Sequence, residues 1–439
     1  MTKQHHSRFR SAARSAVLRR TTLFVALLGV ASCAYATDGY FTHGYGMKAQ
    51  GRGGASVAFT DDAFGGANNP ATMAFAGNRL ELGLSAFSPR RSASRTGLGP
   101  GLDGSSSSNR EWFGIPEFGY NHMLNDRLAL GLTVYGNGGM DTDYPGGSFN
   151  CGMGAANMLC GQGNLGVDLM QLIVAPTLAY AFTPRQSIGV APLLVYQRFS
   201  AYGLQAFAGT PGLSVDPARV TNNDHDSSTG FGLRIGYYAR VTDSFAIGAT
   251  YSMKARMSRF SSYAGLFAER GRFDIPSNYG VGFAWTPADG LILALDYTRI
   301  NYGEVPSVGD SSLRPTQLGS DNGPGFGWRD VNVWKLGVEW ASSDRWTWRA
   351  GYNRSDNPIS PSDVTFNILA PGVVTDHLTL GFTRKLASGG ELSMAYMHAF
   401  KHSVSGASIL PVFMGGMPAG TETISMHEDS LGIQYAWKL

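Results

Sequence analysis

The sequence predicts a transmembrane antiparallel β-barrel, and three observations predict it. Long stretches alternate apolar and polar residues, as strands do when they place successive side chains on opposite faces. Short polar turns join these stretches in pairs, and long loops join the pairs at their other ends. Only 15% of the residues are charged, yet no run of 18 apolar residues exists, so a helical membrane span is excluded.

The first residues have the pattern of an export signal. Residues 1–20 carry six basic residues and no acid, and an apolar run follows at 23–30. Ala34-Tyr35-Ala36 then matches a cleavage site, so residues 1–36 are predicted to be a signal peptide. A lipoprotein signal ending at Cys33 is the alternative.

Charge and cysteine usage agree with an exported protein. Removing the six basic residues of the signal from the 35 Lys and Arg leaves 29 against 32 acids, a net charge of −3. That balance gives no indication of nucleic-acid binding. Cys151 and Cys160 share one glycine-rich loop, where a local disulfide is expected. A metal site is not expected, because no further ligands lie nearby.

Six polar turns set the strand count. They are Asn125-Asp126-Arg127, Thr183-Pro184-Arg185-Gln186, Thr242-Asp243-Ser244, Pro287-Ala288-Asp289-Gly290, Ser342-Ser343-Asp344-Arg345 and Ala387-Ser388-Gly389-Gly390. The runs on either side give fourteen strands, at 79–89, 110–123, 128–138, 168–182, 187–200, 228–240, 245–257, 273–286, 291–302, 330–341, 346–355, 376–386, 391–402 and 426–438. Fourteen is an even number that leaves both ends on the side of the short turns, and residues 78–439 are predicted to form the barrel. A soluble all-β protein is the alternative.

Residues 37–77 do not alternate and are rich in glycine and alanine. A barrel of this size left empty would hold an aqueous channel. The segment is therefore predicted to lie inside the barrel as a plug. Its apolar residues, among them Phe41, Phe59 and Phe64, argue against the alternative of a disordered tail.

These residues resemble the FadL-type outer-membrane transporters over essentially the whole mature chain. The similar segments are Gly44-Tyr45-Gly46-Met47-Lys48, Asp61-Asp62-Ala63, Asn69-Pro70-Ala71, Gly166-Val167-Asp168-Leu169, Ala175-Pro176-Thr177, Tyr196-Gln197-Arg198-Phe199, Tyr263–Glu269 and Phe366–Val374 followed by Asp376-His377. The runs at 263–269 and 366–377 are the most specific.

The resemblance implies a function and a route. It implies an outer-membrane protein of a Gram-negative bacterium that passively takes up long-chain fatty acids or similar hydrophobic molecules, acts without a cofactor, and is inserted by the barrel-assembly machinery among outer-membrane lipids as a monomer. Ligand would pass from an outer apolar groove to an interior pocket, and then through a lateral gap beside a kinked third strand. The gating residues would be Tyr40, Phe41, Asn69, Pro70 and Ala71 of an N-terminal hatch and Gly136, Asn137, Gly138 and Gly139 of the third strand. Glycines weaken ladder pairing and permit a kink there, although an ordinary strand end is the alternative.

A fatty-acid carboxylate needs a cation once it leaves water. By motif the resemblance places basic ligands at Arg198 and Arg329. Strand parity puts Arg329 on the lumen side, with Lys335 and Glu339. The parity of Arg198 is that of a lipid-facing residue, so a bulge would be needed to turn it inward. Either arginine has the alternative of a solvated charge at the rim or a partner of a lumen acid.

The outer groove is expected from apolar residues in two loops. The candidates are Phe207 in the first loop and Phe260, Tyr263, Leu266 and Phe267 in the second, together with Phe199 at the end of the preceding strand. Exposed apolar patches commonly mark binding sites. Packing of the two loops against each other is the alternative.

Other functions are weighed against this one. The same fold with a neutral aromatic hydrocarbon as ligand is the nearest alternative, and a surface adhesin or phage receptor is the alternative of another class. A general porin is disfavoured by the plug. No protease, hydrolase or phosphate-binding motif is present, so an enzyme is not expected.

Overall fold

The computed structural model describes residues 38–152, 154–410 and 420–439, within the compact unit from Cys33 to Leu439. The predicted signal peptide, residues 1–36, lies outside the described residues. The strands are β1 Arg79–Thr96, β2 Gly104–Ser107, β3 Phe113–Asn125, β4 Leu128–Tyr144, β5 Phe149–Asn150, β6 Ala155–Ala156, β7 Leu165–Thr183, β8 Gln186–Tyr202, β9 Asp226–Arg240, β10 Phe245–Ser252, β11 Arg256–Met257, β12 Asn278–Ala288, β13 Leu291–Ile300, β14 Val331–Ala341, β15 Trp346–Ser355, β16 Asp376–Lys385, β17 Glu391–Ala407 and β18 Thr421–Lys438. The helices are α2 Met47–Gly51, α3 Gln205–Gly209, α4 Ala268–Gly271, α5 Pro306–Gly309 and α6 Val364–Asn367, with 3-10 turns η1 Pro70–Phe75, η2 Pro217–Arg219, η3 Ser261–Tyr263, η4 Tyr302–Glu304 and η5 Pro361–Asp363.

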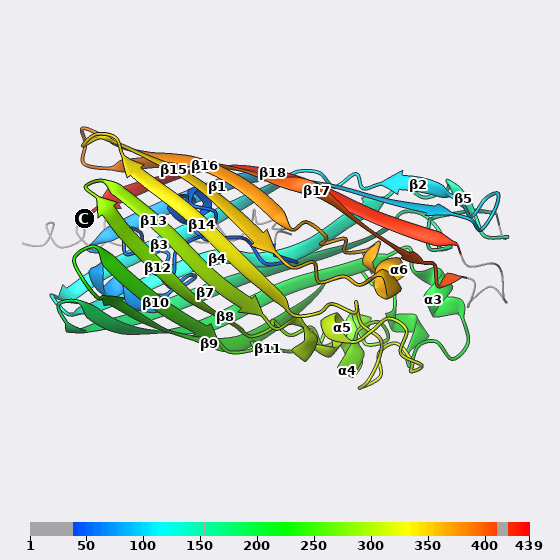
Figure 1. Cartoon of the computed structure of the whole chain (residues 1–439). Coiled ribbons are helices and arrows are strands. Elements are labelled where there is room, and N and C mark those ends of the chain that lie inside the picture. Colours follow the sequence, from blue (N-terminus) through cyan, green and yellow to red (C-terminus); the bar gives the residue numbers. More distant parts are fainter. Residues whose placement is uncertain (1–37, 153, 411–419) are drawn as a thin grey trace, which may run out of the picture. The chain divides into compact units, whose positions relative to one another are not determined.

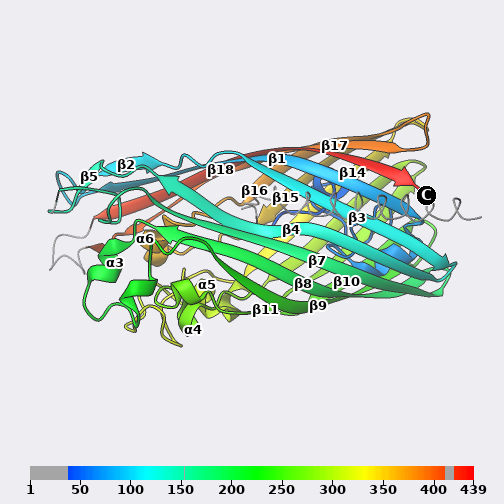
Figure 2. The same cartoon turned by 180° about the vertical axis from the view of Figure 1, so that it is seen from behind.

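Fourteen long strands close into an antiparallel barrel, as the sequence predicts (Figures 1 and 2). Neighbours in sequence are neighbours in the barrel, and β18 pairs with β1 from Arg79–Lys438 to Thr96–Thr421. All six predicted turns join paired strands. Closure removes the free sheet edges that hydrocarbon would not tolerate. The prediction of the fold class is therefore confirmed.

The barrel is apolar on its outside and polar on its inside, which is the reverse of the arrangement in a soluble protein. Large apolar side chains are exposed on the outside, including Leu84, Leu194, Leu336, Leu380 and Ile433. Polar residues such as Gln197, Asp296 and Asn353 are buried on the inside. An apolar exterior matches lipid, and a polar interior matches a lumen. Among the described residues, no helix has both the length and the apolar character needed to cross a membrane.

Strand lengths differ from the prediction mainly at the loop end. β1 continues to Thr96, β4 to Tyr144 and β17 to Ala407. In β1 and β4 the added residues include polar side chains on both faces, so the alternation that identifies a membrane strand disappears there, and in β17 the added residues 403–407 are small apart from Val404. The predicted strand 273–286 instead begins at Asn278, because Phe273 and Asp274 are buried in the loop that precedes it.

Residues 38–78, here called the N-terminal segment, lie inside the ring of strands (Figure 1, blue). Helix α2 contacts β15 to β18, and η1 contacts β4 and β7 to β9, on the other side of the ring. Strand side chains hold its backbone: Asp296 Oδ2 accepts from the amides of Ser56 and Val57 at 2.7 and 2.9 Å, and Gln434 accepts from the amide of Met47 at 2.8 Å. The segment thus fills lumen space between opposite walls.

Buried ion pairs fasten the same segment to the short-turn half of the barrel. Arg52 contacts Asp61 at 2.9 Å within the segment and Glu339 of β14 at 2.7 Å. Arg349 of β15 contacts Glu339 at 2.7 Å. Lys48 contacts Glu391 of β17 at 2.8 Å. Three strands, β14, β15 and β17, thus carry charged side chains that pair directly or through Glu339 with charged side chains of residues 48–61.

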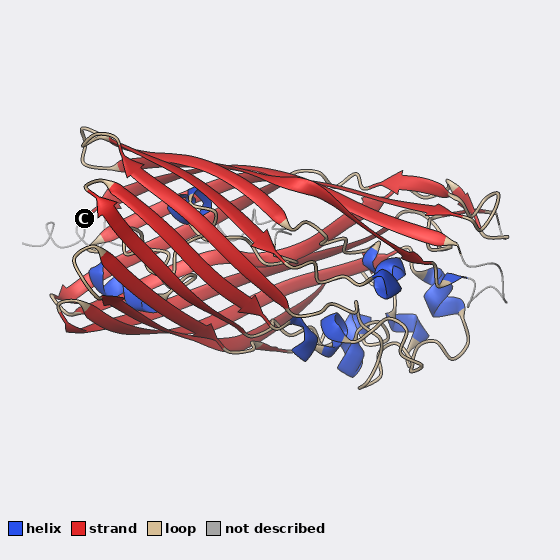
Figure 3. Cartoon of the chain, viewed as in Figure 1, coloured by secondary structure: helices blue, strands red, loops and turns tan. Residues whose placement is uncertain are grey.

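The outer loops carry the short helices α3 to α6, grouped at the barrel end opposite the short turns (Figure 3). Asp363 connects two of these loops. Its carboxylate accepts hydrogen bonds from the hydroxyls of Ser311, Ser312, Ser360 and Ser362 at 2.7–2.9 Å and from the Ser312 amide at 2.8 Å. Burial raises the pKa of Asp363, but the serine hydroxyls together outweigh burial and hold this pKa below its ordinary value.

A depressed pKa in the folded loops means that the ionised form of Asp363 stabilises them. This contribution is present at neutral pH and is lost as the pH falls through the lowered pKa, below about 3.9. We expect the protection factors of residues 306–328 and 356–370, in which the intrinsic effect of pH on amide exchange is removed, to be lower at pH 3 than at pH 7. Asp363→Asn should have low protection factors at both pH values, because it lacks the charge. Asp321→Asn, an exposed change in the same loop, is the control, and equal exchange in all three proteins would contradict this role.

Candidate functional site

The outer loops enclose an apolar space, here called the outer pocket. Its volume is about 490 Å³. It is lined by Val167, Phe199, Leu204, Phe207, Leu266, Phe267, Ser307, Leu318, Pro324, Gly325, Phe326, Phe366 and Leu369. The only polar side chain of this lining is Ser307, whose hydroxyl donates to the Arg272 carbonyl at 2.6 Å. No charged side chain of the described residues lines the pocket, so it suits an apolar ligand.

The predicted groove residues converge here. Phe199, Phe207, Leu266 and Phe267 line the outer pocket. Phe260 and Tyr263 lie behind Phe199, with ring centroids at 5.6 and 4.8 Å from its ring. A 3-10 turn, η3, and a separate helix, α4, bring Phe260, Tyr263 and Phe267 together. The loops also pack on each other, since Phe207 lies 5.4 Å from Phe366.

A second space, the inner pocket, lies deeper in the barrel and has a volume of about 320 Å³. It is lined by Gly39, Tyr40, Phe87, Pro89, Arg91, Gly139, Met140, Asp141, Thr142, Trp328, Ala370, Pro371, Gly372 and Met426. Tyr40 lies 5.8 Å from Trp328 and 5.1 Å from Tyr302, measured between ring centroids. The N-terminal segment therefore supplies one wall of this pocket.

Two chain segments connect the pockets. In the first segment, Phe326 lines the outer pocket and Trp328 lines the inner pocket. In the second segment, Leu369 lines the outer pocket and Ala370 lines the inner pocket. Consecutive Cα atoms are about 3.8 Å apart, so only a thin partition separates the two spaces. The Trp328 indole donates to Asn367 Oδ1 at 2.5 Å, which fixes one element of that partition.

Arg91 is the cation of the inner pocket. It is 6% exposed, and its guanidinium donates to the backbone carbonyls of Asp141 and Arg110. The guanidinium also lies 5.7 Å from the ring centroid of Phe113. Sequence reasoning missed this residue, because β1 contains four arginines and nothing in their spacing marks Arg91.

The barrel wall is interrupted beside β4. The β3–β4 ladder ends at Phe118–Val134, whereas the β4–β7 ladder continues to Tyr144–Leu165. The register of β4 against β7 shifts between Gly136 and Gly138. Asn137 lies in this irregularity, and its amide donates to Gln171 Oε1 at 2.9 Å. The predicted kink is present, with Gly136 to Gly139 at its centre.

The N-terminal segment covers this part of β4 from inside. Phe41 forms a β-bridge with Gly138. A Cβ atom on Gly138 would lie 1.7 Å from the Tyr40 carbonyl oxygen, so only glycine permits this approach. Further along this segment, the Asn69 side-chain amide donates to the Val57 and Tyr237 carbonyls at 2.8 and 2.9 Å. The Asn69 side-chain oxygen accepts from the Ala71 amide. Pro70 is the first residue of η1.

Arg198 does not point into the barrel. The ladder of β8 with β9 runs without a shift from Gln186–Ala239 to Phe199–Asp226, so no bulge turns Arg198 inward. Its neighbours Gln197 and Phe199 are buried, and Arg198 contacts Asp168 at 3.3 Å with 36% of its side chain exposed. The alternation along the strand correctly predicts that Arg198 faces outward. The motif, which predicts a ligand-binding arginine here, does not predict this direction.

The lumen-side placement predicted for Arg329 is wrong. The prediction extended the parity of β14 backward, but that strand begins at Val331. Before it, Trp328 is buried and Arg329 is exposed, and the Arg329 amide donates to the Pro358 carbonyl at 2.9 Å. The alternation of inward and outward side chains holds only within the strand, so it does not predict which way the Arg329 side chain points.

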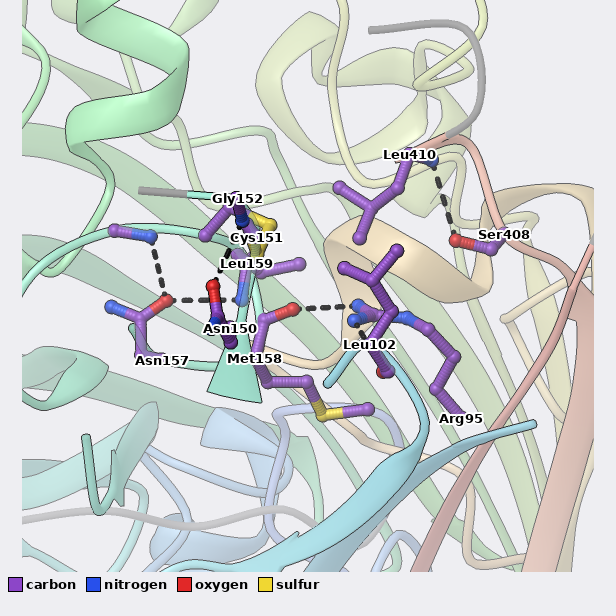
Figure 4. Close-up of a disulfide and its surroundings, with 12 residues drawn as sticks. Arg95, Leu102, Asn150, Cys151, Gly152, Asn157, Met158, Leu159, Ser408 and Leu410 are labelled. Atoms are coloured by element: carbon purple, nitrogen blue, oxygen red, sulfur yellow. Dashed lines mark hydrogen bonds between the residues drawn. A yellow bond between two sulfur atoms is a disulfide. The ribbon is translucent and has the colours of Figure 1, made fainter. Parts of the chain in front are cut away.

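The loop between β4 and β7 contains a disulfide between Cys151 and Cys160 (Figure 4). Both cysteines pack against the buried side chains of Leu98, Leu102 and Leu410. Among the described residues, no group of three or more His, Cys, Asp or Glu side chains is arranged to hold a metal ion.

Several lining residues were not predicted from the sequence. Leu318, Phe326 and Trp328 come from the long loop before β14, and Phe366 and Leu369 from the loop before β16. Leu318, Phe326 and Trp328 are single apolar residues in a segment rich in glycine, proline and serine, so no periodicity marks them. For Phe366 and Leu369 the available signal was the resemblance of residues 366–377 to an outer loop of the FadL-type transporters.

Several solved structures share the fold of this chain. A Pseudomonas putida toluene transporter, TodX, is 18% identical, with a TM-score of 0.65 over 90% of this chain and 99% of its own. A FadL homologue of Pseudomonas aeruginosa is 17% identical, with a TM-score of 0.67 over 91% and 99%. The Ralstonia pickettii toluene transporter TbuX is 18% identical, with a TM-score of 0.61 over 90% and 99%. At these identities the likeness concerns the fold. No curated protein matches the sequence.

A family model gives the stronger result. Residues 28–408 match the model described as outer membrane protein transport protein (OMPP1/FadL/TodX). This match spans most of the chain, and it agrees with the closed barrel, its apolar exterior and the pockets inside it. The protein therefore belongs to the OMPP1/FadL/TodX family of outer-membrane proteins, which transport hydrophobic compounds.

Proposed function

We propose that this protein passively takes up hydrophobic small molecules from the outer pocket, through the inner pocket, to an outlet beside β4. The observation that carries the proposal is the continuity of three features. An uncharged apolar pocket among the loops adjoins an interior pocket, and the interior pocket reaches Gly139 to Thr142 of β4, where the β3–β4 ladder is absent. The N-terminal segment, acting as a hatch, would close the barrel to water.

The apolar outer pocket supports a neutral ligand. A carboxylate buried there would lose water without gaining a cation, which is costly. Arg198 and Arg329, predicted as carboxylate ligands, do not line it. Uptake of a neutral hydrocarbon is thus the substrate class that this pocket favours. A long-chain fatty acid is the second candidate, and Arg91 in the inner pocket is the observation that favours it.

The outer pocket can be tested by placing a charge in it. We expect Leu266→Glu to reduce the uptake rate of labelled toluene by tenfold or more, because the ligand would have to displace a hydrated carboxylate. Leu313→Glu is the matched control, since Leu313 is 53% exposed and lies outside the pocket. Uptake would be measured in vesicles carrying the purified protein. Equal rates in the two variants would remove the outer pocket from the route.

The outlet can be tested at Gly138. We expect Gly138→Ala to push residues 38–41 away from β4, since the added methyl would overlap the Tyr40 carbonyl oxygen. Amide exchange of residues 38–45 should become faster, and ion leakage through planar bilayers should rise. Gly114→Ala is the control, because a Cβ atom there meets nothing within 4 Å. A tight bilayer seal combined with faster exchange would show that these residues do not close a path.

The choice between the two ligand classes rests on Arg91. If fatty acids are carried, Arg91→Gln should weaken oleate binding about tenfold, or about 1.4 kcal/mol, and leave toluene binding unchanged. Arg198→Gln should change neither, since this side chain faces outward. Binding would be measured by equilibrium dialysis of radiolabelled ligands. Equal oleate binding in the wild type and in Arg91→Gln would exclude Arg91 as the carboxylate partner.

A further inference from the structure

A third cavity lies between the disulfide loop and α3. The empty space among its lining residues is about 1090 Å³, counting the open solvent at its mouth. The disulfide of Cys151 and Cys160 forms one side, and Gln205 to Thr210 form the other. We infer that this cavity, here called the disulfide pocket, binds an uncharged amphiphile and passes it to the outer pocket. The inference rests on the proposed function.

The walls of the disulfide pocket are held in place. Arg95 and Glu422, both fully buried, form an ion pair at 2.7 Å, and Arg95 also donates to the Met158 carbonyl at 2.6 Å (Figure 4). The Asn157 side chain accepts from the amides of Leu159 and Gly161 at 3.0 Å. With the disulfide closing a short loop, this wall keeps its shape without a ligand.

The loop is also tied to α3 at the edge of the cavity. The Asn157 amide donates to the Gly203 carbonyl at 2.9 Å. Gln205 Oε1 accepts from the Gln162 amide at 3.0 Å, and the Gln205 side-chain amide donates back to the Gln162 carbonyl at 3.4 Å. These bonds connect the disulfide loop to the segment that contains α3. They therefore hold the two walls of the cavity in a fixed position relative to each other.

The lining identifies the ligand class. Apolar contacts come from Leu159, Ala206, Phe207 and Leu410, and polar contacts come from neutral groups of Gln162 and Thr210. No charged side chain of the described residues lines the cavity. An alkyl chain with a hydroxyl or ester head finds both partners it needs, whereas a carboxylate finds no cation.

Phe207 places the disulfide pocket on the route. This residue lines both the disulfide pocket and the outer pocket, so one aromatic ring lies between them. Phe207 belongs to α3, which has five residues and no side-chain cap. A ligand held on one side of the ring thus needs only a local displacement to reach the other side.

The test fills the disulfide pocket while sparing the outer pocket. Gly209 lines the disulfide pocket but not the outer pocket, and a Cβ atom there meets nothing within 4 Å. Gly209→Trp is therefore expected to fold and to occupy the cavity, and Ala206→Trp fills it from the same helix as a second variant. Gly114→Trp is the matched control, since Gly114 lies on the outer surface and has equal room. The shift in gel mobility on heating checks that each barrel has folded.

Equilibrium dialysis of radiolabelled 1-dodecanol and dodecanoate against each protein, held in amphipol, gives the readout. We expect Gly209→Trp and Ala206→Trp each to bind one equivalent of dodecanol fewer than the wild type and Gly114→Trp. Dodecanoate should not occupy the disulfide pocket, so its stoichiometry should be equal in all four proteins. A dodecanol stoichiometry equal to that of the wild type in both filled variants would overturn the inference, as would the loss of one dodecanoate equivalent in them.

The same measurement separates this inference from the function on which it rests. Leu266→Glu should lose the equivalent held in the outer pocket and keep the one in the disulfide pocket. If Leu266→Glu loses an equivalent while Gly209→Trp and Ala206→Trp lose none, the proposed function stands and the disulfide pocket is not a site. If the wild type binds neither probe, the proposed function fails together with the inference.

Discussion

The arrangement inside the barrel depends on the buried ion pairs between the N-terminal segment and the wall. Arg52 neutralises Glu339, which also contacts Arg349, and Lys48 contacts Glu391. Removing one partner of a buried pair leaves a charge without compensation, which typically costs about 3–5 kcal/mol. Withdrawal of the whole segment would break the Arg52–Glu339 and Lys48–Glu391 pairs at once. In the proposed route we therefore expect the passage to open without moving residues 48–61.

Residues 38–45 are held differently, and this difference locates the movable part. Phe41 meets β4 through backbone, and the Tyr40 amide donates to the Tyr302 hydroxyl at 3.2 Å. The ion pair of Asp38 with Lys335 is long, at 4.0 Å. Gly46, with φ of 83°, directly precedes α2 and gives the chain a point at which its direction can change. In the proposed route we therefore expect this short stretch to uncover the inner pocket while the remainder stays fixed.

The barrel was predictable because membrane and lumen impose opposite requirements on successive residues. That rule fixes the fourteen strands and the outward facing of Arg198, and it ends where lipid ends. This alternation does not predict the direction of the Arg329 side chain, because Arg329 precedes β14. It also does not predict how far β1 and β17 extend beyond the membrane. Residues such as Trp328 and Leu369 reach the pockets through loop paths set by tertiary contacts, of which Asp363 and its serines are one. Such contacts join distant segments and leave no period in the sequence.

The distribution of charge along the route assigns different tasks to its parts. The outer pocket offers apolar surface without a cation, so it can hold the alkyl part of an acid or of an alcohol and leave the head group in water. Of the three pockets, the inner one alone has a buried cation, Arg91, in its lining. Asp141 lines the same space, but its carboxylate pairs with Arg110 at 3.8 Å, and Arg91 is hydrogen-bonded to Asp141 through the backbone carbonyl. In the proposed route, an incoming carboxylate would meet the Arg91 guanidinium, whereas a neutral molecule would leave its backbone contacts as they are. The proposed route thus places discrimination by charge in the inner pocket, and discrimination by size and apolar surface in the pockets among the outer loops.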